Sequence, residues 1–479
     1  MKSVRLWSVR HAYGLSSLYD LFMRFIPYLR RVITWIGRGR AERWLVPTER
    51  TIKEFFFDCK MCGRCSLSST GMACPMNCPK RHRNGPCGGV GADGSCEVDP
   101  GMRCVWLEAA DGSRRMDAGV KFASVQPPVD ANLQGSSAWI RTIMDETVSK
   151  PASPPAPVVA EAPPAPDRKP GALETACRSG RFVVTAELSP PDSADPQDLL
   201  RRTAPFRGIV DAVNVTDSAG AHCHMSSLAA SALLIADGYE PVFQMACRDR
   251  NRIAMQGDIL GAGALSVRNL LAITGDGVGS GDHPNARPVF DLDSVSLLQI
   301  ARGLRDRGEF ASGRKVTKRP DLFLGATINP FAPPFEERMT NFAKKIAAGA
   351  QFVQTQYCFD LPVFESFMRR ARERGLDRLC HIIVGVGPLP SARTARWMMA
   401  HVPGVSIPEA VLSRLEAAQD QKREGIRICI ETIQALRAIE GVAGVHLMAH
   451  RNESLVPGIL QESGLMTERN TAAVQRGVA

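Results

Sequence analysis

Residues 241–276 read PVFQMACRDRNRIAMQGDILGAGALSVRNLLAITGD. This stretch opens with an apolar run at 241–247, continues as a helical stretch at 250–261 and closes with a second apolar run at 269–274. Runs of this length that are apolar on both faces are typical of parallel strands buried in a sheet. The stretch therefore predicts one strand–helix–strand unit of a parallel sheet.

The same alternation extends on both sides of this unit. Further apolar runs lie at 182–189, 212–217, 322–328, 352–357, 381–386 and 445–449, and further helical stretches at 196–204, 226–237, 292–305, 334–348, 361–374, 392–401 and 408–439. Eight such repeats over about 275 residues predict an α/β fold of the (β/α)8 type, a TIM barrel, which we assign to residues 173–465. A doubly wound open sheet is the alternative, but the sequence has no glycine-rich nucleotide fingerprint to favour it.

A linker rich in proline and alanine, residues 151–172, precedes the predicted barrel. Its first twenty residues read PASPPAPVVAEAPPAPDRKP, with eight prolines and five alanines. This composition cannot build a core and favours an extended, semi-rigid chain. The connecting segment at 111–150 shows only a short helical candidate at 138–148, and residues 466–479 are expected to form a flexible tail.

Residues 1–50 form a basic arm. They contain ten Lys or Arg against three Asp or Glu, so they carry most of the formal net charge of +10. Apolar residues at 15–36 recur every three or four positions, which predicts an amphipathic helix that Pro27 can kink. Packing within the protein or against a partner subunit is the favoured interpretation. Contact with an anionic membrane surface and an unstructured arm are the alternatives.

Charge and hydropathy exclude several classes of protein. Because most of the net positive charge lies in the arm, we predict no nucleic-acid-binding body. Hydrophobic content of 44% and charged content of 23% are ordinary globular values, which exclude wholesale disorder, collagen and coiled coil. The most apolar stretch, 15–37, is interrupted by Asp20 and three arginines, so no membrane-spanning segment is expected.

Cysteines are concentrated in residues 51–110, which we predict to be a cysteine-rich metal-binding domain. Eight of the 14 lie there: Cys59, Cys62, Cys65, Cys74, Cys78, Cys87, Cys96 and Cys104. The others are scattered singly and no secretion signal is visible, so a reduced, cytoplasmic location is expected. Two-residue gaps let neighbouring thiolates converge on one metal. The pattern is like iron–sulfur ligation, and C-x2-C pairs equally build zinc sites. A disulfide-stapled module is the alternative, and His82 is expected in a solvated basic turn.

The residues around these cysteines also resemble those of a known domain. The segments RNGPCGG at 83–89, GSCEVDP at 94–100 and CVW at 104–106 closely resemble the cysteine-rich domain that accompanies some bacterial methylenetetrahydrofolate reductases. In those proteins it is a fused domain or a separate partner subunit.

Polar residues follow the predicted strands at their C-terminal ends, where the active sites of TIM barrels lie. They are Glu187, Thr216, Asp217, Arg248, Asp249, Thr274, Asp276, Asn329, Gln356, His450 and Arg451. Two carboxylates on non-adjacent strands, with amide and cationic groups, predict a polar mouth that suits a large ligand and acid–base chemistry.

At these positions the barrel resembles the methylenetetrahydrofolate reductase family. The matching segments are TAELSPP at 185–191, VNVT at 213–216, QMACRDRN at 244–251, ITGD at 273–276 and QTQYCFD at 354–360. The family is a flavin-containing (β/α)8 barrel that reduces 5,10-methylenetetrahydrofolate to 5-methyltetrahydrofolate by hydride transfer from flavin N5 to an iminium carbon. Two departures are the Leu-Ser before the Pro-Pro turn, where better-known members carry two aromatics, and Gln244, which replaces a histidine of some relatives.

The resemblance implies roles for individual residues. Glu187 matches the general acid that protonates folate N10, and Asp276 matches the aspartate whose charge stabilises the iminium. The implied flavin-binding residues are Thr216, Gln244, Asp276, Phe290 and Lys345, and the implied folate-binding residues are Gln356 and Arg451. Purely structural alternatives are an ion pair for Glu187, a turn or helix cap for Asp276 and a solvated helix position for Lys345.

The resemblance also implies cofactors and partners. FAD is the expected flavin, with FMN as the alternative. The electron donor is NADH or NADPH, or an electron-carrier protein acting through an iron–sulfur cluster. We also expect a homo-oligomer. The competing hypothesis is a non-catalytic folate- or corrinoid-linked subunit of a one-carbon assembly.

Overall fold

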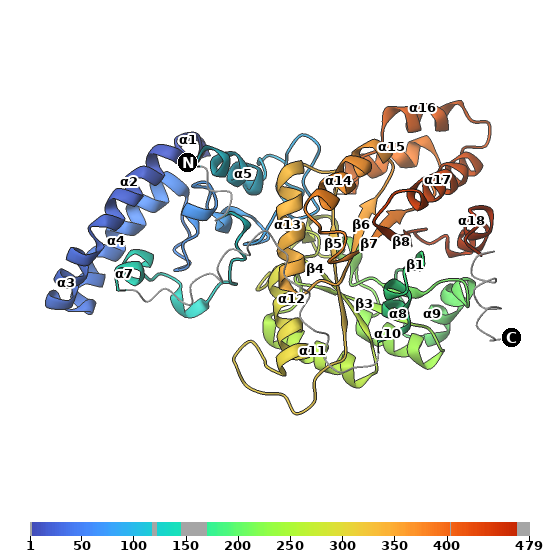
Figure 1. Cartoon of the computed structure of the whole chain (residues 1–479), viewed down its shortest axis with the longest axis horizontal. Helices are drawn as coiled ribbons and strands as arrows, with labels where there is room; N and C mark the ends of the chain where they lie inside the picture. The colour runs from blue at the N-terminus through green and yellow to red at the C-terminus, as the bar shows by residue number, and fades with distance from the viewer. Residues whose placement is uncertain (1, 117–121, 145–169, 403, 467–479) are drawn as a thin grey trace.

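The computed structural model of the chain describes residues 2–116, 122–144, 170–402 and 404–466. Eight parallel strands close into a barrel in sequence order, and β1 pairs with both β2 and β8 (Figure 1). The strands are β1 (Val183–Leu188), β2 (Ala212–Val215), β3 (Pro241–Ala246), β4 (Asn269–Ile273), β5 (Phe323–Ile328), β6 (Phe352–Tyr357), β7 (His381–Val386) and β8 (Val442–Leu447). The predicted TIM barrel is therefore confirmed, and the open sheet is excluded.

Helices surround the barrel (Figure 1). They are α9 (Pro196–Thr203), α10 (Ser227–Ala236), α11 (Arg252–Ala264), α12 (Ser294–Arg302), α13 (Phe335–Ala348), α14 (Leu361–Glu373), α15 (Ala392–His401), α16 (Glu409–Ala417), α17 (Gln421–Arg437) and α18 (Val456–Glu462). Most begin at a side-chain cap, as when Asp420 accepts from the Arg423 backbone at the start of α17. This cap divides the helical stretch expected at 408–439 into α16 and α17.

The alternation of side chains along each strand separates two apolar layers. In β1, Val184, Ala186 and Leu188 face the helices and join the main core. The floor of the barrel is a second core, in which Val183 packs with Leu173 of α8 (Ala172–Arg178). Thr185 and Glu187 take the opposite direction to the outer layer and point into the barrel. A glutamate in an otherwise apolar strand is thus brought to the interior mouth.

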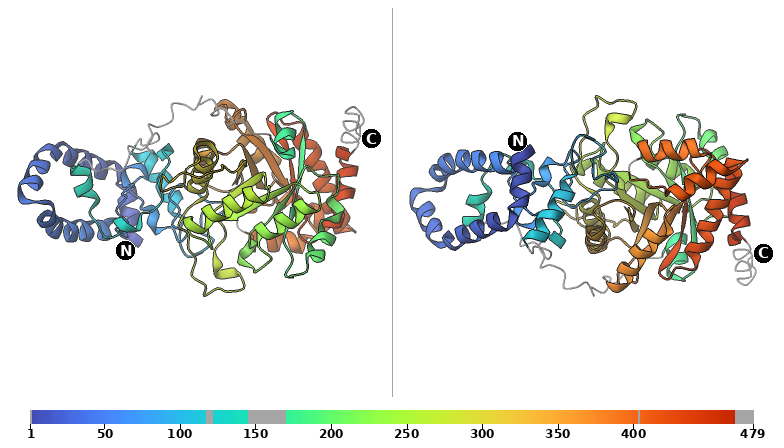
Figure 2. Two further views of the ribbon diagram at one scale, coloured as in Figure 1. Left: turned by 90° about the horizontal axis from the view of Figure 1, so that it is seen from below. Right: turned by 90° about the horizontal axis from the view of Figure 1, so that it is seen from above.

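The N-terminal helices project away from the barrel (Figure 2). Helices α1 (Lys2–Arg10), α2 (Ala12–Arg24) and α3 (Ile26–Ile36) run outward, and α4 (Arg38–Phe57) returns beside them. The helix expected at 15–36 is broken at Phe25, just before Pro27, because proline cannot donate a backbone hydrogen bond. One face of this arm packs internally, with Ile33 against Ile143 of α7 (Ala138–Ile143).

Between α4 and α5 (Val105–Arg115) the chain is irregular, with short 3-10 helices η1 (Leu67–Ser69) and η2 (Pro75–Asn77). Part of it, residues 80–97, lies on the mouth of the barrel, and we call it the mouth segment. Within the described ranges, none of the helices combines the length and apolar composition needed to cross a bilayer. Parts of three predicted segments lie outside the described residues. They are residues 145–148 of the helical candidate, 151–169 of the linker and 467–479 of the tail.

Candidate active site

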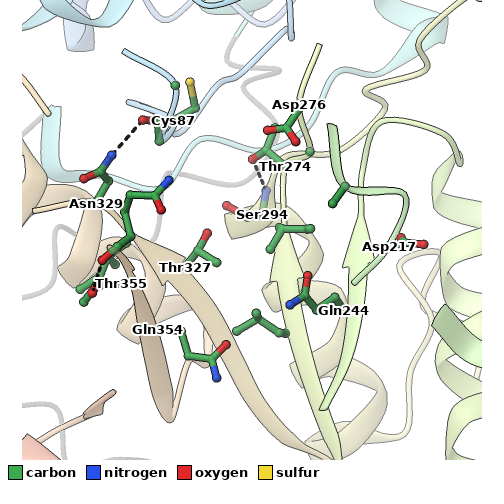
Figure 3. Close-up of a pocket in the computed structure, with 18 of the residues that line it drawn as sticks. Cys87, Asp217, Gln244, Thr274, Asp276, Ser294, Thr327, Asn329, Gln354 and Thr355 are labelled. Atoms are coloured by element: carbon green, nitrogen blue, oxygen red, sulfur yellow. Dashed lines mark hydrogen bonds between the residues drawn. The ribbon is translucent and has the colours of Figure 1, made fainter. Parts of the chain in front are cut away.

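A cavity of about 270 Å³ lies at the C-terminal ends of the strands, where the sequence placed the site. Six of the eight residues to which the resemblance gave a catalytic or binding role line it: Glu187, Thr216, Gln244, Asp276, Lys345 and Gln356. They come from β1, β3, β6, α13 and the ends of β2 and β4. Figure 3 shows Gln244 and Gln354 on one side of this space, with Asp276 and Cys87 of the mouth segment on the other. The geometry thus brings both proposed catalytic carboxylates to one cavity.

Glu187 stands above a buried polar network. Its Oε2 lies 3.6 Å from Nε2 of His446, and its side chain keeps a quarter of its exposure. The other ring nitrogen of His446 lies 2.9 Å from the Thr185 hydroxyl, which also accepts a hydrogen bond from Gln354 (3.2 Å). The imidazole of His446 is therefore the neighbour of the Glu187 carboxyl group. Sequence reasoning missed His446, whose only signal was a titratable residue inside the last apolar run.

Asp276 is held in place by the loop after β2. Its Oδ2 accepts a hydrogen bond from the Gly220 backbone at 3.0 Å. The carboxylate still lines the cavity, so this turn contact orients it without removing it from the site.

Thr216 and Lys345 present groups that suit a polar cofactor. The Thr216 side chain is buried, and its Oγ1 has no hydrogen-bond partner among the described residues. Buried hydroxyls usually have a partner, so this orphaned atom points to a ligand. Lys345 is buried and donates to the Thr327 carbonyl at 2.5 Å. Its burial excludes the alternative of a solvated helix lysine. Burial, with the nearby charge of Arg338, also lowers the pKa of Lys345 to about 8.

Two of the predicted site residues lie away from the cavity lining. Phe290 is buried with a positive φ of 41°, and it is not among the lining residues. Arg451 is an exposed side chain whose nearest acidic partner is Asp192 at 3.9 Å. Both residues were predicted only from the family resemblance. Both lie on loops, whose positions the strand pattern constrains least.

The mouth segment supplies lining residues that sequence analysis missed. Lys80, His82, Cys87 and Glu97 line the cavity together with the strand ends. Lys80 Nζ donates to the Gly275 carbonyl at 2.6 Å, and His82 Nε2 lies 3.1 Å from the Thr274 hydroxyl. His82 is therefore buried and not in a solvated turn, and burial lowers its pKa to about 4 against the opposing charge of Asp293.

Hydrogen bonds anchor the mouth segment to the barrel. Asp293, the cap of α12, accepts from the backbone of Arg83 (3.1 Å) and of Asn84 (2.9 Å). The Asn84 carbonyl accepts from Asn341 at 2.7 Å, and the Cys87 carbonyl accepts from Arg338 at 2.6 Å. These contacts join residues more than 200 positions apart, so no local sequence pattern could reveal them.

The arrangement of the cysteines does not support the predicted metal centre. Across the described ranges, no group of three or more His, Cys, Asp or Glu side chains is placed to hold a metal ion. All fourteen cysteines are free, so the disulfide-stapled alternative is wrong.

Comparison with known proteins adds independent information. The sequence model of a family described as "Methylenetetrahydrofolate reductase" matches residues 172–464, and one described as "Methylene-tetrahydrofolate reductase C terminal" matches residues 39–132. Because the second description refers to a C-terminal region, the likeness of residues 59–106 to a fused cysteine-rich domain stays a prediction.

Individual relatives have similar names. A probable methylenetetrahydrofolate reductase (NADPH) of Caenorhabditis elegans is 28% identical over 246 residues, covering 50% of this chain and 34% of that protein. Methylenetetrahydrofolate reductase (NADH) 1 of Arabidopsis thaliana is 27% identical, covering 42% and 34%. A 5,10-methylenetetrahydrofolate reductase of Pectobacterium carotovorum subsp. carotovorum is 22% identical, covering 60% and 91%. The chain thus spans about a third of the two eukaryotic relatives and most of the bacterial one.

A solved structure of an uncharacterized protein from Clostridium thermocellum, described as binding 5-methyl-5,6,7,8-tetrahydrofolic acid, aligns with a TM-score of 0.45 and 12% identity. It covers 61% of this chain and 98% of that chain. A likeness this weak carries no argument about function.

Proposed function

Because the chain belongs to the methylenetetrahydrofolate reductase family, we propose that it is a flavoenzyme that reduces 5,10-methylenetetrahydrofolate to 5-methyltetrahydrofolate. One observation carries the proposal above the others. Glu187 and Asp276, from opposite parts of a closed barrel, line the same cavity. An acid and a separate anion in one pocket are what the opening of the folate ring to a cationic iminium requires.

The residues of the cavity fit a flavin. The orphaned hydroxyl of Thr216 and the amide of Gln244 can bond the polar edge of the ring, and buried Lys345 is a cation suited to a phosphate. A bound flavin supplies hydride from its N5. We propose FAD, with FMN as the alternative, since both carry the same ring.

We propose that Glu187 protonates folate N10 and so turns it into a leaving group. The carboxyl lies 3.6 Å from the His446 imidazole and keeps a quarter of its exposure, so it remains open to the cavity. Asp276 then stabilises the iminium by its charge, and the Gln356 amide binds the pterin. A role for Arg451 at the glutamate tail requires the exposed side chain to turn toward bound substrate.

NADH or NADPH is the proposed electron donor, as in the names of the relatives. An electron-carrier protein is the alternative. We also propose a homo-oligomer and the division of the chain into arm, cysteine-rich region, linker and barrel that the sequence suggested.

The test is product formation by the full-length protein. The protein is reconstituted with FAD or FMN, supplied anaerobically with NADH, NADPH or dithionite, and given 5,10-methylenetetrahydrofolate. We expect 5-methyltetrahydrofolate, detected by liquid chromatography, at least with dithionite. A protein that holds reduced flavin and forms no product would instead be the non-catalytic folate-binding subunit.

A further inference from the structure

Lys80 and Glu97 form a buried ion pair inside the candidate site. Their side chains keep only 4% and 7% of their exposure, and both line the cavity with Asp276. Neither residue belongs to the barrel, and neither has a place in the proposed chemistry. Burying two charges costs desolvation energy that their mutual attraction rarely exceeds, so the pair is a poor device for stability alone.

The pair is positioned by close contacts on both sides. Lys80 Nζ donates to the carbonyl of Gly275, the residue before Asp276, at 2.6 Å. A Cβ at Gly89 would lie 1.9 Å from the Glu97 carboxyl carbon, so a side chain there would displace the carboxylate. The Cys87 thiol lies 3.9 Å from Glu97 Oε1. The mouth segment is therefore shaped around this pair at the edge of the cavity.

We propose that Lys80 and Glu97 are positioning residues of the cofactor site, which set the charge beside Asp276 and with it the electron affinity of the bound flavin. The inference rests on the proposed function. Asp276 by itself opposes the addition of negative charge to a neighbouring ring, and Lys80 offsets that effect at short range in a water-poor site. The negative charge of Glu97 partly neutralises Lys80 and so limits the offset.

Reduction of the flavin adds two electrons and one proton, so the ring gains one negative charge. Loss of the Lys80 cation should therefore make reduction harder, and loss of the Glu97 anion should make it easier. Opposite shifts from two adjacent side chains distinguish an electrostatic role from a merely structural one, which would move both variants in the same direction.

The experiment measures the midpoint potential of the bound flavin in the full-length protein, by dithionite titration against a reference dye at fixed pH. We expect Lys80→Met to lower the potential by about 30 mV, the equivalent of a tenfold change in a two-electron equilibrium constant. Glu97→Gln should raise it, and the double variant should return close to wild type. Lys60→Met is the matched control, because Lys60 lies in the same region, pairs with Asp58 and keeps half its exposure.

Circular dichroism and flavin stoichiometry check each variant for folding. If Lys80→Met does not fold, Glu97→Gln decides alone, and a potential that does not rise overturns the inference. Unchanged potentials, or shifts of the same sign in both variants, overturn it as well. A wild-type protein that binds flavin but forms no product would refute the proposed function and leave this inference standing, whereas one that binds no flavin refutes both.

Discussion

At the scale of single residues, the proposed acid Glu187 makes the sharpest prediction. Glu187→Gln keeps the shape of the side chain and removes its proton. We expect folate reduction to fall about 10²–10⁴-fold, the usual contribution of general acid catalysis, while flavin content stays unchanged. The rate is measured as 5-methyltetrahydrofolate formed per bound flavin.

The control for this substitution is Glu373→Gln. Glu373 ends α14 on the surface and lies outside the cavity lining, so its loss should leave the rate unaltered. A Glu187→Gln protein that reduces folate at the wild-type rate would exclude the acid role.

Thr216 predicts a separation between stability and cofactor binding. Its buried hydroxyl has no partner among the described residues, so Thr216→Val should leave the stability of the flavin-free protein unchanged or raise it by about 1 kcal/mol. Flavin affinity should fall about tenfold, because a hydrogen bond to the ligand is lost. Urea denaturation and flavin titration measure the two effects.

Thr203→Val is the matched comparison. The buried Thr203 hydroxyl donates to the Leu199 carbonyl at 2.8 Å, so its replacement should cost about 1 kcal/mol without changing flavin affinity. Equal destabilisation in both variants, with flavin binding intact, would contradict the interpretation of Thr216.

Residues of the site differed in how readily the sequence revealed them. Glu187 and Gln356 were predictable because each lies near the end of a strand that must face the mouth of a barrel, whereas Gln244 was carried by the resemblance alone. Lys80 was not, because its partner Gly275 lies 195 positions away and a proline-rich linker intervenes. Phe290 and Arg451 lie outside the cavity lining, on loops whose position the strand pattern does not constrain.

At the scale of elements, the periodicity of apolar residues predicted where helices lie better than it predicted where one helix ends and the next begins. The stretch at 408–439 has apolar residues at helical spacing on both sides of residues 419–425, and Asp420 caps a new helix inside it. The arm breaks in the same way before Pro27. Breaks of this kind depend on one side chain and a local turn, to which a periodicity averaged over several turns is insensitive.

Glycines inside two barrel helices predict effects of opposite sign. A Cβ at Gly425 of α17 would lie 1.8 Å from the Leu389 carbonyl oxygen, so Gly425→Ala should destabilise the protein by about 1–3 kcal/mol. At Gly257 of α11 a Cβ meets nothing within 4 Å, so Gly257→Ala should stabilise by about 0.5–1 kcal/mol. Urea denaturation compares the two, and a stabilised Gly425→Ala would show that α17 is not packed closely on that loop.

At the scale of the whole molecule, the cysteine-rich region and the barrel share a core. Lys344 of α13 is buried there, 5.6 Å from the Trp106 ring and 5.1 Å from the Phe122 ring. Burial lowers its pKa to about 8, against the opposing charge of Asp293. Burying the charged lysine at this junction costs desolvation free energy at neutral pH. Its contacts with the two aromatic rings offset only part of that cost.

Lys344→Met should therefore stabilise the protein by about 1–3 kcal/mol at pH 7. Between pH 8 and about 10.5 the unfolded wild-type chain binds the proton more tightly than the folded one, so wild-type stability rises and the advantage of the variant shrinks. Urea denaturation across this pH range measures the difference.

Lys422→Met, at an exposed position on α17, is the control and should show no such pH dependence. An advantage of Lys344→Met that persists undiminished at pH 10.5 would mean that Lys344 is not buried as a cation at this junction.

The most direct measurement is a single turnover. The flavin bound to the full-length protein is reduced anaerobically with one equivalent of dithionite and then mixed with 5,10-methylenetetrahydrofolate in a stopped-flow spectrometer. We predict that the absorbance of oxidised flavin returns and that one 5-methyltetrahydrofolate forms per flavin, in the wild-type protein but not in Glu187→Gln. Reduced flavin that persists in the presence of the folate would contradict the account.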